Sequence, residues 1–63
     1  KMEEALERAT LIMQMLDKVY PFEKNMSNDV REGVDVARQM LVLRSGWKSM
    51  PIEELRQIVA GGQ

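Results

Sequence analysis

Apolar residues recur at helical spacing between positions 28 and 44, and we expect this stretch to organise the rest of the chain. On a helix of about 100° per residue, its apolar positions fall within an arc of roughly 120°, the width of a stripe that faces a core. Ser27 or Asp29 could cap the start of this helix, and Gly46 could adopt a left-handed cap after its end. The pattern therefore predicts a helix over 28–44. Its stripe consists of Val30, Gly33, Val34, Ala37, Met40 and Leu41.

A matching stripe runs through positions 2–20. Its apolar residues lie 3, 4, 3, 4 and 3 positions apart, which is the spacing of a and d positions in a heptad. Pro21 ends this predicted helix, because the residue before a proline is biased out of the helical region. The short link over 21–27 suits two antiparallel neighbours. The stripe consists of Met2, Ala5, Ala9, Ile12, Leu16 and Val19, with Leu6, Met13 and Tyr20 beside it.

A short third helix is predicted over 51–60. Pro51 suits the first helical position, and Glu53 and Glu54 follow in the first turn, where negative charge is favourable. About ten residues are marginal as an isolated helix, so this segment has to dock on the others. We therefore expect one all-α domain over 1–63, an antiparallel helical hairpin plus a short third helix. The expected hairpin core is Ile12, Leu16, Val34, Ala37 and Leu41.

Each long helix carries a second apolar flank that a simple hairpin cannot use. Leu11 and Met15 form this flank on the first helix, and Val36 and Leu43 form it on the second. One explanation is that the third helix, together with Trp47, covers one flank and completes a three-helix core. The other, which we favour, is that a flank is buried against another copy or another protein. The predicted interface of a homodimer that forms a helical bundle is therefore Leu11, Met15, Val36, Leu43 and Trp47.

The composition excludes several kinds of functional site. A single core in a chain of 63 residues rarely supplies more than about 3–5 kcal/mol, so association with another chain is a natural support. The absence of Cys and His excludes disulfides, the common zinc-ligand sets, and Ser-His or Cys-His catalysis. The carboxylate pairs Glu3-Glu4 and Glu53-Glu54 lie in first turns, where the helix dipole explains them. We expect no enzyme activity, metal, cofactor or small-molecule substrate.

The charges are mixed along the chain, nine basic against ten acidic residues, and this pattern disfavours nucleic-acid and membrane partners. We interpret Arg31, Arg38 and Arg44 as part of a solvated face with salt bridges. The longest apolar run, at 40–43, is far shorter than the roughly 20 residues that cross a bilayer. We see no signal peptide and expect a cytoplasmic protein.

The predicted function is a small protein-protein interaction module with a regulatory, adaptor or assembly role. The alternative is a DNA-binding transcriptional regulator that uses the segment 42–58. Glu53 and Glu54 lie in that segment and would face phosphates in a complex, which disfavours the alternative.

Overall fold

The computed structural model describes residues 1–61, and within that range the chain forms three helices and no strand. They are α1 (Met2–Val19), α2 (Asn28–Ser45) and α3 (Ile52–Gly61). The all-helical fold is confirmed, and each helix end lies within one residue of the predicted position.

The ends of α2 are fixed by short-range contacts. Of the two candidate caps, Ser27 is the one observed, because its hydroxyl accepts a hydrogen bond of 3.2 Å from the backbone N–H of Val30. At the other end Gly46 has φ 78°, the left-handed conformation that glycine adopts without steric cost. Ser27 is a local signal for the start of α2, and Gly46 is a local signal for its end. The sequence therefore predicts these two boundaries well.

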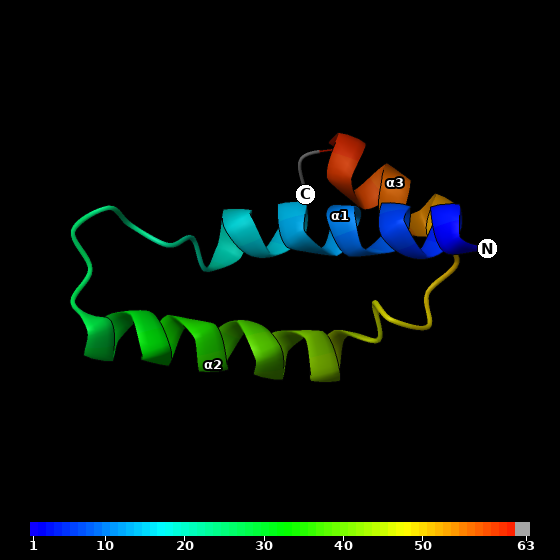
Figure 1. Ribbon diagram of the computed structural model, residues 1–63. Helices are drawn as coiled ribbons and strands as arrows, with labels where there is room; N and C mark the ends of the chain where they lie inside the picture. The colour runs from blue at the N-terminus through cyan, green and yellow to red at the C-terminus, as the bar shows by residue number, and fades with distance from the viewer. Residues whose placement is uncertain (62–63) are drawn as a thin grey trace.

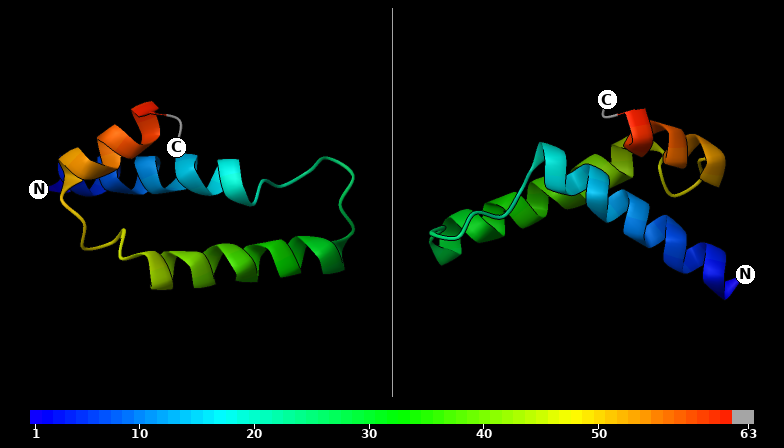
Figure 2. Two further views of the ribbon diagram at one scale, coloured as in Figure 1. Left: turned by 180° about the vertical axis from the view of Figure 1, so that it is seen from behind. Right: turned by 90° about the horizontal axis from the view of Figure 1, so that it is seen from above.

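α1, rather than α2, is the centre of the arrangement. In Figure 1 it lies between α3 and α2. The backbones of α1 and α3 approach closely, and no other pair of helices within residues 1–61 shows comparable proximity. Seen from above, α1 and α2 cross at an angle, so that the N-terminal half of α1 diverges from α2 (Figure 2, right). This differs from the predicted pairing of two long helices along their full stripes.

A small core lies where α3 docks on α1. Leu55 of α3 is completely buried, and around it pack Ile12, Met15 and Leu16 of α1. Half-buried side chains from all three helices, and from the connection between α2 and α3, lie at the margin of this cluster. These half-buried residues are Leu11, Leu41, Val42, Trp47, Met50, Ile52, Ile58 and Val59.

The chain is more extended than a compact domain of its size. Its radius of gyration is 12.6 Å, whereas a compact domain of 63 residues has about 11 Å. It exposes 4909 Å², whereas a typical monomeric protein of 7.3 kDa exposes about 4,200 Å². The difference, about 700 Å², is surface that a more closely packed chain of this mass would hide.

Gly33 provides a test of the open side of α2. This glycine lies on the apolar stripe predicted to face the core, yet a Cβ built on it meets no atom within 4 Å. Gly33→Ala is therefore expected to stabilise the protein by about 1 kcal/mol, because alanine has the higher helix propensity. Urea denaturation at one chain concentration measures this change. A destabilised variant would mean that a second molecule packs against Gly33.

Candidate protein interface

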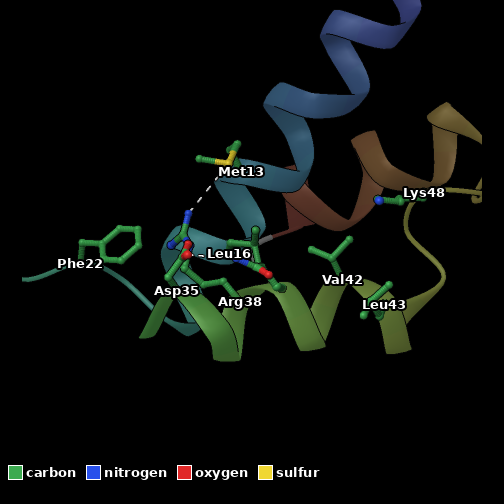
Figure 3. A pocket seen from close by; sticks show the side chains of 9 residues that line it. Met13, Leu16, Phe22, Asp35, Arg38, Val42, Leu43 and Lys48 are labelled. Atoms are coloured by element: carbon green, nitrogen blue, oxygen red, sulfur yellow. Dashed lines mark hydrogen bonds between the residues drawn. The ribbon is translucent and has the colours of Figure 1, made fainter. Parts of the chain in front are cut away.

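Arg38 is the one charged residue of α2 that is buried within the described part of the chain, with 4% of its surface exposed. Its Nη1 donates a hydrogen bond of 2.8 Å to the carbonyl oxygen of Tyr20 and lies 3.0 Å from Oδ1 of Asp17. Its Nη2 lies 3.9 Å from the sulfur of Met13 (Figure 3). The interpretation of Arg38 as part of a solvated face is wrong. This side chain ties the middle of α2 to the C-terminal end of α1.

Phe22 lies beside Arg38, on the connection between α1 and α2. The guanidinium carbon of Arg38 is 4.6 Å from the centroid of the Phe22 ring, and that of Arg31 is 5.3 Å from it. Both distances lie in the range of a cation–π contact. The two arginines therefore hold the aromatic ring at the edge of α2, where it stays partly exposed.

A groove of about 410 Å³ opens between α1 and α2 next to Arg38. Figure 3 shows Met13 and Leu16 above it, Phe22 at one end, and Val42 and Leu43 along the α2 side. The mouth of the groove is therefore mainly apolar, although polar side chains border it. Its polar and charged lining residues are Asp35, Arg38, Gln39 and Lys48.

An exposed line of apolar side chains runs along the N-terminal part of α1 and reaches this groove. We call Met2, Leu6, Ala9 and Met13 the α1 seam, because helix geometry places them within an arc of about 60°. Met2 is 78% exposed, Leu6 63% and Met13 50%, and Ala9 is also exposed. Met13 belongs both to the seam and to the groove. The two features therefore form one continuous apolar surface.

A second and shorter line lies on the outer side of α2, and its last residue, Leu43, also lines the groove. We call Val36, Met40 and Leu43 the α2 strip; Val36 is 57% exposed and Leu43 70%. The spacing of four and three positions places these residues on one face of the helix. The α2 strip is therefore the alternative to the α1 seam as a surface that a partner could bind.

The predicted interface residues divide into two groups. Val36 and Leu43 are exposed, as expected for a surface residue. Met15 differs from the expectation, because it is a core residue with 4% exposure. Leu11 and Trp47 are half-buried against the same core. The reason is that α3 docks on the flank of α1 that carries Leu11 and Met15, so this flank is covered within the chain.

The predicted hairpin core is also divided. Ile12 and Leu16 belong to the buried cluster, and Leu41 packs against it from α2. Val34 and Ala37 are half-buried but lie outside the cluster. α1 therefore supplies most of the core, and α2 contributes only its margin.

Arg8 is a positioning residue that the sequence analysis missed. Its guanidinium donates hydrogen bonds to the carbonyl oxygens of Trp47, at 3.2 Å, and of Met50. It also lies 3.5 Å from the carboxylate of Glu4, one turn earlier. These contacts attach the connection between α2 and α3 to α1, and they place α3 beside the Leu11–Met15 flank.

An exposed ion pair joins α1 to α3. Arg56 donates two hydrogen bonds, of 2.6 and 2.8 Å, to the carboxylate of Glu7. These hydrogen bonds hold the pKa of Glu7 below its ordinary value; desolvation opposes the shift and the positive charge of Arg56 adds to it. The pair is solvent-exposed, so its contribution is modest and screened by salt.

The Glu7 pair predicts a particular pH dependence of stability. Because the folded state lowers the pKa of Glu7, the stabilisation is fully present above the unfolded value and is lost as the pH falls through the folded value. Glu7→Gln is therefore expected to differ most from the parent near neutral pH and to converge with it as the pH falls below the ordinary pKa of a glutamate. Urea denaturation over this range measures the difference. Glu3→Gln, which removes an exposed carboxylate of the same helix, serves as the control; a difference for Glu7→Gln that grows on acidification would contradict the assignment.

Among residues 1–61, acidic side chains nowhere form a group of three or more that could hold a metal ion. No helix in that range combines the length and the apolar character needed to cross a bilayer. Comparison with protein-family models, with curated proteins and with solved structures finds no match to this chain.

Proposed function

We propose that this chain is a small protein-protein interaction module that acts as a homodimer. In this proposal α1 and α2 are the arms of a helical hairpin, and a second copy completes a helical bundle. The observation that carries it is the balance of apolar side chains: within residues 1–61, ten large hydrophobic side chains are exposed and four hydrophobic residues form the core. Scattered exposed hydrophobic residues are normal, but a continuous apolar surface is typical of an interaction site.

The amount of surplus surface supports a dimer. Each partner of a standard interface contributes about 800 Å², and this chain exposes about 700 Å² more than a typical monomer of its mass. Covering that surplus by association would bring the exposed area per chain to an ordinary value. The net charge of −1 also gives two copies little mutual repulsion.

The role of such a module is to present an apolar surface, which suits a regulatory, adaptor or assembly protein. Methionine contributes to this surface at Met2, Met13 and Met40. Its flexible thioether side chain adapts to irregular neighbours, so these residues suit an interface. A chain without cysteine suits the cytoplasm, and this is the location that we propose.

Light scattering coupled to size-exclusion chromatography tests the proposal. A homodimer has twice the chain mass of 7.3 kDa, and interfaces of this size have dissociation constants from micromolar downward. We expect the dimer mass at about 100 μM chain and a fall toward the monomer mass on dilution. A constant monomer mass up to about 500 μM would overturn the homodimer.

A further inference from the structure

We infer that a second copy of this chain covers the α1 seam, with the two α1 helices antiparallel across a two-fold axis. This inference rests on the proposed homodimer and names its contact surface. The N-terminal half of α1 diverges from α2 (Figure 2, right), so another helix has access to the seam. Met2 and Leu6, which occupy this half, are among the most exposed large hydrophobic residues of the described chain.

The solvent-exposed area of the chain indicates that the partner on the α1 seam is a second copy. A symmetric dimer buries the same patch on both subunits, so each copy has to supply about half of a standard interface, or about 800 Å². The surplus of about 700 Å² over a typical monomer matches that share. The apolar seam continues into a groove of about 410 Å³, so a second copy on the seam would cover both.

Charge distribution favours the α1 seam over the α2 strip. Along the length of the seam, the positions that border it on its two sides are Ala5 and Thr10, both uncharged, and Asp17, one turn beyond Met13, is paired with Arg38 of the same chain. On α2, Asp29 lies in line with the strip, seven positions before Val36, and Glu32 lies close to that line. An interface that extended from the strip along α2 would have to desolvate these two carboxylates, and this cost disfavours the strip.

Symmetry fixes which residues meet. The midpoint of the seam lies between Leu6 and Ala9, and an antiparallel pair centred there covers the whole seam of both copies. Leu6 then lies opposite Ala9 of the second copy, so that a large side chain meets a small one. Met13 lies opposite Met2 of the second copy, which brings that flexible side chain to the groove. The antiparallel arrangement also places opposite ends of the two helix dipoles together.

A matched pair of substitutions tests the surface. Leu6→Glu and Val36→Glu each place a carboxylate at a position that is more than half exposed in the single chain, so the subunit should stay folded in both, as circular dichroism can verify. We expect Leu6→Glu to raise the dimer dissociation constant by at least about 100-fold, because each interface would bury two unpaired carboxylates. Val36→Glu should change it less than about threefold. The opposite ranking would overturn the inference and leave the homodimer standing.

Cross-linking tests the same surface without adding a charge. Because the chain has no cysteine of its own, a single introduced cysteine is the only site that can react. A short bis-maleimide should link Ala9→Cys into a covalent dimer, because positions 9 of the two copies lie only about 5 Å apart along the axis. Met2→Cys should not be linked, since the two positions 2 lie about 16 Å apart in the antiparallel pair. Linkage of Val36→Cys instead of Ala9→Cys would overturn the α1 surface, and efficient linkage of Met2→Cys would overturn the antiparallel order. A parent protein of monomer mass would overturn the proposed function itself.

Discussion

Leu55→Ala is expected to lower the free energy of unfolding by about 2–5 kcal/mol, as large-to-small changes at buried leucines do. Leu55 has no exposed surface and is the residue through which α3 packs against Ile12, Met15 and Leu16 of α1. The cavity that this substitution leaves would lie between α1 and α3, the helix pair whose backbones approach most closely within residues 1–61. A core this small supplies little more than that amount, so most of the variant should be unfolded.

Circular dichroism with urea titration measures this loss, with all proteins at one chain concentration because association adds to apparent stability. Val36→Ala is the matched control, since Val36 is more than half exposed and alanine favours helix. We expect its stability to stay within about 0.5 kcal/mol of the parent. Equal losses in the two variants would contradict a core centred on Leu55.

Arg38→Glu is the second substitution for which we expect a large loss of stability. The substitution replaces a buried guanidinium, which pairs with Asp17 and donates to the carbonyl of Tyr20, with a carboxylate. The new carboxylate would be buried close to Asp17 and would have no donor. A buried charge left without a partner costs about 3–5 kcal/mol. α2 should detach from the C-terminal end of α1.

Arg31→Glu makes the same change of charge at an exposed position of α2. Arg31 also contacts the Phe22 ring, so we expect a loss of up to about 1 kcal/mol. Urea titration gives both values, and amide hydrogen exchange reports whether α2 is released in Arg38→Glu. Similar stabilities for the two variants would show that Arg38 does not anchor α2.

The helices could be predicted from the sequence because the signals that start and end them are local. Pro21 ends α1 within one residue of the expected position, Ser27 caps α2, and Gly46 takes the left-handed conformation after it. Each of these residues acts on its own backbone or on a neighbour a few positions away. No information about distant parts of the chain is needed.

The packing of the helices could not be predicted in the same way, because α1 is apolar on two flanks. Spacing alone does not distinguish the flank of Leu11 and Met15 from that of Leu6 and Met13. The choice depends on contacts between residues far apart in sequence, above all Arg8 with the carbonyl of Trp47. As a result α3 covers the first flank, and the second is left exposed.

The sequence does contain two signals that bear on these contacts. Arg8 lies on the same arc of α1 as Ile12 and Met15, so it is a charge within a stripe that becomes buried. Arg38 has Val34, Leu41 and Val42 at positions i−4, i+3 and i+4, so its neighbours on the helix surface are apolar. A cation among apolar neighbours is costly to bury unless it finds acceptors. In both cases backbone carbonyl oxygens provide them.

Thermal unfolding at different chain concentrations tests most directly whether the folded chain depends on a second copy to cover its exposed apolar side chains. For a dimer the midpoint temperature rises with concentration, because association stabilises only the folded state. We expect a clear rise between about 2 and 200 μM chain, and a smaller one for Leu6→Glu. A midpoint that stays constant over this range would show that each chain is stable with its apolar surface open to water.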